Sequence, residues 1–182
     1  MARPALFLDR DGVINIDHGY VYRKEEFEFV DGIFDLVSKA HNAGYLVIVV
    51  TNQAGIGRGY YTEADFHELM NWVCDEFKRH GGQIDAVYFC PDHPEHGIGA
   101  YRRESHYRKP GPGMLLQAAS DFDIDMDRSI MIGDKPSDMV AARTAGVGRL
   151  LELVRPDETS DYVAITGFRE ALRFIEGVGL EP

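Results

Sequence analysis

The sequence predicts an α/β fold in which a doubly wound parallel sheet is covered by helices on both faces. First, short apolar runs alternate with segments whose apolar residues recur at helical spacing. Second, residues 45–50 are apolar without interruption, which is typical of a strand covered on both faces. Third, polar residues directly follow three of the apolar runs, and ligands of such folds bind beyond the carboxyl ends of the strands.

The first half of the chain supplies two of the strands and two helices. The apolar run 6–8 predicts the first strand, and apolar residues at helical spacing over 32–42 predict the first helix. After the strand over 45–50, Thr62 is the expected N-cap of a second helix. The apolar stripe of that helix continues until Gly81 and Gly82, which end it.

The second half alternates in the same way around one exception. A strand is expected over 86–89, and the pattern then fails over 90–108, which predicts an irregular specificity loop. The elements expected after this loop are a helix over 112–119, a strand over 129–132, a helix over 136–145, a strand over 149–153, an edge strand over 162–164 and a final helix over 167–176.

Length and composition predict one domain over residues 1–182. The 182 residues are 45% hydrophobic, which fits one compact domain with a core and leaves too little chain for a second domain such as a separate cap domain. A net charge of −11 argues against nucleic acid or a membrane surface as a partner. Two cysteines, no signal region and no long apolar run predict a cytoplasmic protein, which we expect to be a monomer.

Asp9 and Asp11 follow the first strand and precede Gly12. Residues two apart on extended backbone project to the same side, so the pair has the geometry to share a metal ion or to divide the work of nucleophile and proton carrier. An Asx-type turn is the structural alternative. A calcium loop fits less well, because the glycine comes at the fourth position and no helix flanks the segment.

Three further groups of polar residues follow other elements. Thr51 and its neighbours follow the most apolar strand, where they either hold phosphate oxygens or cap a turn. Lys109 follows the irregular loop, where it is either a charge partner for the carboxylates or a solvated surface residue. Asp134 has the chemistry to complete a magnesium site, whereas Asp138 either binds through a water, fixes Lys135 or serves the helix dipole.

These four motifs together resemble those of the haloacid dehalogenase (HAD) superfamily of phosphatases. The matching residues are Asp9-x-Asp11-Gly12, Thr51, Lys109 and Gly133-Asp134-x-x-x-Asp138, and the resemblance covers nearly the whole chain. Within the superfamily, residues 7–15, 50–59, 108–110 and 132–135 are similar to the D-glycero-D-manno-heptose 1,7-bisphosphate 7-phosphatase group, whose close relative is the histidinol-phosphate phosphatase group.

The resemblance implies a role for each catalytic residue. It implies that Asp9 attacks phosphorus and forms an aspartyl phosphate, while Asp11 protonates the leaving group and later activates water. It implies Mg²⁺ bound by Asp9, by the backbone carbonyl of Asp11 and by Asp134, and a phosphoryl group held by Thr51 and Lys109. A carboxylate attacks a phosphate dianion only when cations remove the repulsion between them.

The resemblance also implies a set of residues around the substrate, which are Asp17, His18, Gly19, Tyr20, Asn52, Gln53, Ala54, Arg108 and Lys135. Among them, Arg108 is expected to recognise the sugar or its distal phosphate.

The loop before Arg108 departs from the family's pattern. The family usually carries a structural zinc there, held by Cys-x-His and Cys-x-Cys pairs, but only Cys90 is retained. Asp92, Ser105 and Tyr107 stand in the places of the other ligands. We therefore expect no structural zinc, although nearby histidines leave an improvised site open. The alternative is a loop held by packing and hydrogen bonds.

The leading hypothesis is a Mg²⁺-dependent phosphatase that hydrolyses the 7-phosphate of a small sugar bisphosphate, D-glycero-D-manno-heptose 1,7-bisphosphate, in the synthesis of the lipopolysaccharide core. A histidinol-phosphate or other sugar-phosphate phosphatase is the alternative within the class. A noncatalytic sugar-phosphate binding module is the alternative outside it, and the intact Asp9, Asp11, Lys109 and Asp134 argue against that alternative.

Overall fold

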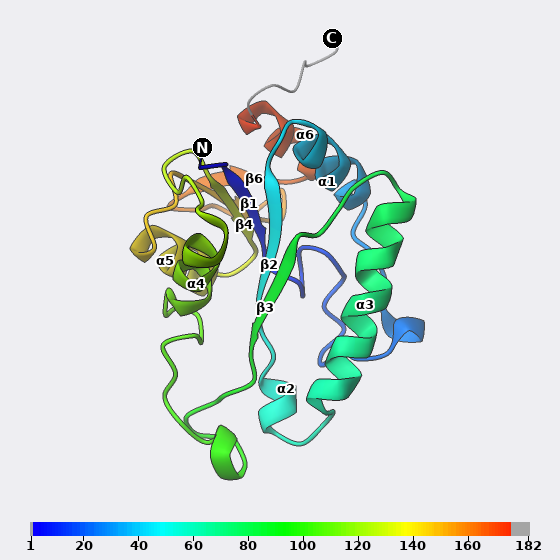
Figure 1. Cartoon of the computed structure of the whole chain (residues 1–182), viewed down its shortest axis with the longest axis vertical. Helices are drawn as coiled ribbons and strands as arrows, with labels where there is room; N and C mark the ends of the chain where they lie inside the picture. Colours follow the sequence, from blue (N-terminus) through cyan, green and yellow to red (C-terminus); the bar gives the residue numbers. More distant parts are fainter. Residues whose placement is uncertain (1, 176–182) are drawn as a thin grey trace.

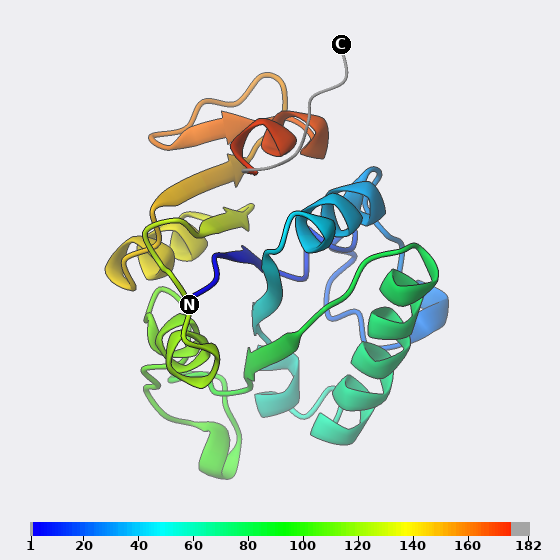
Figure 2. The same cartoon turned by 45° about the horizontal axis from the view of Figure 1, so that its top comes forward.

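The structure is a computed structural model that describes residues 2–175, and one six-stranded sheet forms its centre (Figure 1, Figure 2). In chain order the strands are β1 (Ala5–Leu8), β2 (Leu46–Asn52), β3 (Ala86–Cys90), β4 (Ile130–Gly133), β5 (Arg149–Leu153) and β6 (Val163–Ile165). Their order across the sheet is β3-β2-β1-β4-β5-β6, and all neighbours are parallel. The predicted fold class is confirmed.

Helices cover both faces of this sheet (Figure 1). On one face lie α1 (Ile33–Asn42), α3 (Glu63–Arg79) and α6 (Phe168–Ala171), and on the other lie α4 (Gly113–Phe122) and α5 (Pro136–Thr144). Four short elements complete the described chain: α2 (Ala54–Gly57) and the 3-10 turns Lys24–Glu26, Gly99–Tyr101 and Leu172–Phe174. No helix within residues 2–175 combines the length and apolar character that a membrane crossing requires.

The alternation of side chains along β1 explains why all four of its residues are apolar. Leu6 and Leu8 belong to the core cluster that includes α1 and α3, whereas Ala5 and Phe7 belong to the cluster that includes α4 and α5. All four are fully buried. A polar side chain within β1 would therefore be desolvated, and the first acidic residue comes directly after the strand end, at Asp9.

The predicted N-cap of α3 is present. Thr62 Oγ1 accepts a hydrogen bond from the Asp65 backbone N–H at 3.1 Å, and Asp65 Oδ2 accepts one from the Thr62 N–H at 2.8 Å. This capping box satisfies two backbone donors that the helix itself leaves unbonded, which is worth about 1 kcal/mol.

Most predicted boundaries differ from the observed ones by one to three residues. β2 continues through Thr51 and Asn52, because these residues pair with Phe89 and Cys90 of β3. α4 begins one residue after Pro112, which is its N-cap, and extends to Phe122.

The final helix is the largest difference from the prediction. The expected helix over 167–176 is instead the four-residue α6 followed by the 3-10 turn Leu172–Phe174, and residue 176 lies outside the described residues. Phe168, Leu172 and Ile175 are all buried in this arrangement. A 3-10 turn commonly ends an α-helix, and the spacing of apolar residues alone does not distinguish such a turn from a continuing α-helix.

The topology brings three strand ends together. β1 pairs with β2 on one side and with β4 on the other, so the order of the strands along the chain reverses at β1. The carboxyl ends of adjacent parallel strands lie at one edge of the sheet, and ligand sites form at such a reversal. α2 and the loop before α4 lie beyond the same strand ends (Figure 1).

Candidate active site

Lys109 lies at the centre of the site, bonded to the carboxylates of Asp9 and Asp138. Its Nζ donates hydrogen bonds to Asp9 Oδ1 at 2.9 Å, to Asp138 Oδ1 at 2.5 Å and to the backbone carbonyl of Val50 at 2.8 Å. An ammonium group has three N–H donors, so all of them are used. Lys109 is only 3% exposed, and such a charge is stable in the interior only when it is paired.

Asn52 fixes the backbone of Lys109. Its side-chain Nδ2 donates to the Lys109 carbonyl, and its Oδ1 accepts from the Lys109 N–H, both at 3.0 Å. The resemblance implied that Asn52 contacts the substrate, but in this structure its amide joins the end of β2 to the loop that carries Lys109. Asn52 also lines the cavity described below.

The acidic groups of the site have perturbed pKa values. Burial raises the pKa of Asp9 to about 7, although Lys109 opposes this effect, and burial raises the pKa of Asp134 to about 6. Burial alone would lower the pKa of Lys109, but Asp9 and Asp138 outweigh it and raise that pKa. Three carboxyl groups, those of Asp9, Asp134 and Asp138, lie close together around Lys109. This excess of acidic groups over cations favours the binding of a further cation.

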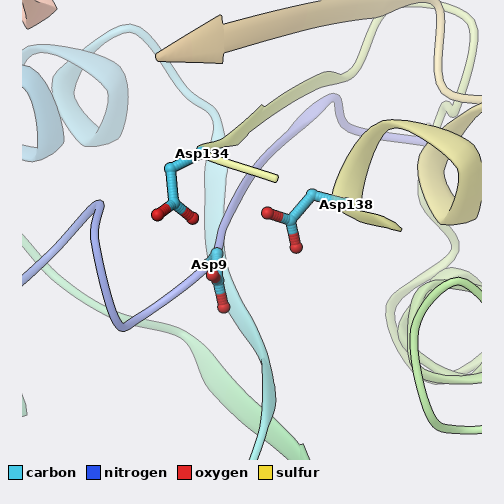
Figure 3. Close-up of side chains that lie close together, drawn as sticks. All are labelled: Asp9, Asp134 and Asp138. Carbon is cyan, nitrogen blue, oxygen red and sulfur yellow. The ribbon is translucent and has the colours of Figure 1, made fainter. Parts of the chain in front are cut away.

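Asp9, Asp134 and Asp138 form a cluster that fits a metal ion (Figure 3). Each offers one carboxylate oxygen, and these oxygens lie within 4.8 Å of one another. Asp134 Oδ1 is buried and has no hydrogen-bond partner among the described residues. Both oxygens of Asp138 are already used, by Lys109 and by the backbone N–H of Lys135. Asp9 and Asp134 therefore have the oxygens available for a hard cation.

Two glycines make room for these acidic side chains. A Cβ at Gly12 would lie 2.0 Å from Asp134 Oδ2, and Gly12 has a φ of +91°, which other residues rarely adopt. A Cβ at Gly133 would lie 2.3 Å from the Cβ of Asp138. The motif glycines therefore allow the close approach of carboxylates from β4 and α5 to the end of β1.

Asp11 has a different environment from Asp9. Its Oδ1 accepts hydrogen bonds from Arg10 Nη2 at 2.6 Å and from Asn15 Nδ2 at 3.1 Å, and its Oδ2 accepts one from Gln53 Nε2 at 3.0 Å. The side chain is 18% exposed. Asp11 lines the cavity described below, so it is close to solvent, although Arg10, Asn15 and Gln53 all donate hydrogen bonds to its carboxylate.

Arg10 is a residue that the sequence reasoning missed. It is fully buried, and its Nη2 also donates to the Val21 carbonyl at 2.6 Å. Its guanidinium lies 5.9 Å from the ring centroids of both Phe27 and Phe66. The sequence places Arg10 between Asp9 and Asp11 at the end of a buried strand, which is unusual for a cation. This position does not show which of the two aspartates Arg10 pairs with.

An open cavity of about 610 Å³ brings together most of the predicted substrate residues, a size within the usual range for small-molecule sites. Its lining includes Asp17, Gly19, Tyr20, Asn52, Gln53, Ala54, Arg108 and Lys135, together with Asp11 and Lys109. His18 is the predicted member that does not line it. The His18 ring instead lies 3.1 Å from Glu28 and lines a separate hollow that contains Glu25 and Glu26.

The cavity is basic although the protein as a whole is acidic. Arg108, Lys109 and Lys135 all line it. Arg108 Nη1 donates to the Asp92 carbonyl at 3.3 Å, and Lys135 Nζ lies 3.7 Å from Asp17 Oδ2 at 53% side-chain exposure. Lys109 is already paired with Asp9 and Asp138, so Arg108 and the half-exposed Lys135 are the cations that favour an anionic ligand in this cavity.

The irregular loop is held by side-chain contacts. Asp92 pairs with Arg103 at 3.0 Å and lies 3.9 Å from the Cys90 thiol, while Tyr101 donates to Glu63 of α3 at 2.8 Å. His93 Nδ1 accepts hydrogen bonds from the backbone N–H groups of Glu95 and His96, at 3.2 and 3.1 Å. These contacts support the alternative of a loop held by packing and hydrogen bonds, and the expected lack of structural zinc stays a prediction.

Comparisons with known proteins agree with this geometry. A family model described as HAD-hydrolase-like matches residues 106–161. The chain is 53% identical over 183 aligned residues to a D-glycero-alpha-D-manno-heptose-1,7-bisphosphate 7-phosphatase of Burkholderia mallei, covering 98% of this chain and 97% of the relative. It is 51% identical to a D-glycero-beta-D-manno-heptose-1,7-bisphosphate 7-phosphatase of Vibrio cholerae, covering 81% and 80% of the two chains.

Solved structures are similar as well. A HAD-like phosphatase from Mesorhizobium loti superposes with a TM-score of 0.87 at 32% identity, covering 96% of this chain and 85% of the other. The D,D-heptose 1,7-bisphosphate phosphatase of B. bronchiseptica, solved with magnesium and phosphate, superposes with a TM-score of 0.73 at 29% identity, covering 82% and 80%.

Proposed function

This chain belongs to the HAD-like phosphatases, within the heptose-1,7-bisphosphate 7-phosphatase family, and from that membership we propose that it converts D-glycero-D-manno-heptose 1,7-bisphosphate to heptose 1-phosphate and inorganic phosphate. The chain is an enzyme of the phosphoric monoester hydrolase class. The reaction would supply heptose 1-phosphate for the synthesis of activated heptose for the lipopolysaccharide core.

One observation carries the proposal. The Asp9 carboxylate accepts a hydrogen bond from Lys109, whose three N–H donors are all used. Close to it lies the carboxylate of Asp134, whose Oδ1 has no hydrogen-bond partner among the described residues. The nearby cavity carries two further cations, Arg108 and Lys135. A nucleophile, a cation site and a basic cavity are what phosphoryl transfer from a doubly phosphorylated sugar requires.

In the proposed reaction, Asp9 attacks the phosphorus at C7 and the bond from phosphorus to the sugar oxygen breaks. Asp11 gives its proton to that oxygen. Water then attacks the aspartyl phosphate, Asp11 takes a proton from the water, and phosphate leaves Asp9. Mg²⁺ held by the carboxylates of Asp9 and Asp134 and by the Asp11 carbonyl would offset the charge of the phosphoryl group. Thr51 and Lys109 hold the phosphoryl oxygens, and the N–H of Lys109 that bonds Asp9 Oδ1 turns to the phosphoryl group for this purpose.

The proposed metal site predicts that Mg²⁺ binds more tightly at high pH. Without metal the pKa of Asp9 is raised to about 7 and that of Asp134 to about 6, so a proton occupies the site in acid. Mg²⁺ displaces this proton, and we expect Kd to fall roughly tenfold or more from about pH 6 to about pH 8. Calorimetry in buffers of different ionisation enthalpy measures both Kd and proton release. A Kd that does not change with pH would contradict this assignment. In the matched variant Asp134→Asn, which lacks one of the two ligand carboxylates, Mg²⁺ should bind more weakly than in the wild type.

The substrate assignment is tested by competition between phosphate esters. With Mg²⁺ present, we expect kcat/KM for heptose 1,7-bisphosphate to exceed that for histidinol phosphate by roughly tenfold or more, because only the former offers a second phosphate to the cations of the cavity. Relatives carry both alpha and beta names, so both anomers are assayed. Phosphorus NMR should show loss of the C7 signal while the C1 signal persists. Preference for histidinol phosphate would overturn the substrate and keep the reaction class.

A further inference from the structure

Gln53 and Tyr61 form a hydrogen-bonded chain that ends on Asp11. We propose that Tyr61, acting through Gln53, is a positioning residue that fixes the Asp11 carboxylate for proton transfer. The same amide also orients the hydroxyl of Thr51. This inference rests on the proposed phosphatase function, in which Asp11 is the acid and base.

The contacts of this chain are direct. The Tyr61 hydroxyl donates a hydrogen bond to Gln53 Oε1. Gln53 Nε2 donates to Asp11 Oδ2 at 3.0 Å and to Thr51 Oγ1 at 2.9 Å. Gln53 is 2% exposed and Thr51 is fully buried, so water does not readily replace these partners.

The chemistry of the partners fixes the direction of each bond. The amide nitrogen donates and a carboxylate oxygen accepts, so the NH₂ group of Gln53 faces Asp11 Oδ2. The carbonyl oxygen of the amide must then face Tyr61. Burial raises the pKa of the Tyr61 phenol, so its hydroxyl keeps its proton and is a permanent donor. Tyr61 therefore holds the amide in the orientation that Asp11 needs.

The second branch acts on Thr51. Its Oγ1 accepts the hydrogen bond from Gln53, while among the described residues its own hydrogen has one acceptor, the Asn52 carbonyl at a long 3.4 Å. A hydroxyl has one hydrogen to donate. With its acceptor side occupied by Gln53, Thr51 can turn that hydrogen toward the phosphoryl group in the proposed reaction.

Two contacts hold Tyr61 in place. Its ring stacks on Tyr22, with centroids 5.1 Å apart and an interplanar angle of 5°. A Cβ at Gly55 would lie 2.3 Å from the Tyr61 ring, so the glycine of α2 leaves the space that the ring occupies. Tyr61 is 6% exposed, which limits its motion.

Tyr61→Phe in the Mg²⁺-loaded enzyme tests the inference. It removes one hydroxyl and keeps the stacked ring, so we expect kcat to fall about tenfold while KM changes less than about twofold. Tyr22→Phe is the matched control, because it removes a hydroxyl from the other ring of the stack and the described residues form no hydrogen bond with that hydroxyl. Tyr61 lines the cavity and Tyr22 does not, so KM shows whether the Tyr61 hydroxyl contacts the substrate directly. This control should retain the kcat of the wild type.

A double-mutant cycle with Gln53→Leu separates positioning from a general structural role. If Tyr61 acts through Gln53, the tenfold effect of Tyr61→Phe should shrink to less than about twofold in the Gln53→Leu background. An equal effect in both backgrounds, or full activity of Tyr61→Phe, would overturn the inference. Wild-type enzyme that leaves heptose 1,7-bisphosphate intact would instead overturn the proposed function, so the two failures are distinguishable.

Discussion

Replacing Asp9 with asparagine should lower kcat by on the order of 10⁴-fold or more, the size of effect that loss of a covalent nucleophile has in other enzymes. The amide is a poor nucleophile, but its oxygen can still accept the hydrogen bond from Lys109 that holds Asp9 Oδ1. The variant should therefore fold. Phosphate release and intact-mass analysis of acid-quenched enzyme measure turnover and the phosphoenzyme.

Two other aspartates give the controls for this result. Asp35→Asn removes an exposed pair with Lys39 on α1, away from the cavity, so activity should be unchanged. Asp11→Asn should still form the phosphoenzyme, but slowly, because Asp11 moves protons and does not attack phosphorus in the proposed reaction. Asp9→Asn with ordinary turnover would show that another group is the nucleophile.

Replacing Lys109 with methionine should cost both activity and stability. It leaves the carboxylates of Asp9 and Asp138 buried without their ammonium partner. Breaking a buried ion pair in this way typically lowers the free energy of unfolding by about 3–5 kcal/mol. Phosphate release should also fall by about 10³-fold, because Lys109 no longer offsets the phosphoryl charge.

The pH dependence of this destabilisation has a definite sign. Burial raises the pKa of Asp9 to about 7, and loss of Lys109 removes the charge that opposed this effect. A raised carboxyl pKa means that stability falls as pH rises from the unfolded pKa toward the folded one. The destabilisation should therefore be larger at about pH 8 than at about pH 5, where Asp9 is protonated.

Urea unfolding at both pH values measures this difference. Lys39→Met is the control, because the pair that Lys39 forms on α1 is exposed and its loss should cost less than about 1 kcal/mol. A Lys109→Met variant that loses less than about 1 kcal/mol at about pH 8 would show that the buried pairs are not required for the fold.

Sequence reasoning predicted that these residues lie together at one edge of the sheet but not how their side chains pair. Asp9 and Lys109 are one hundred residues apart, and the expectation that they meet came from placing each at the carboxyl edge of one parallel sheet. Strand periodicity does not give side-chain rotamers or partners. The buried pair of Asp138 with Lys109 and the bonds of Asn52 to the Lys109 backbone therefore required the structure.

Two further residues show the same limit. His18 follows Asp17 in the predicted substrate loop, yet its ring points to Glu28, because neighbouring loop residues face in different directions. Tyr61 precedes the N-cap of α3 and gives no sequence signal of its own. Its contact with Gln53 forms across the short turn that follows α2, and hydrophobic periodicity does not predict the conformation of such a turn.

The most direct test of the account is a crystal structure of the enzyme with Mg²⁺ and beryllium fluoride, which mimics an aspartyl phosphate. We expect beryllium bonded to the Asp9 carboxylate, with Mg²⁺ contacting Asp9, Asp134 and the Asp11 carbonyl, and Thr51 and Lys109 contacting fluoride. Beryllium on another carboxylate, or Mg²⁺ bound away from Asp134 in an enzyme that remains active, would contradict the assignment of Asp9 as the nucleophile of a metal-dependent phosphatase.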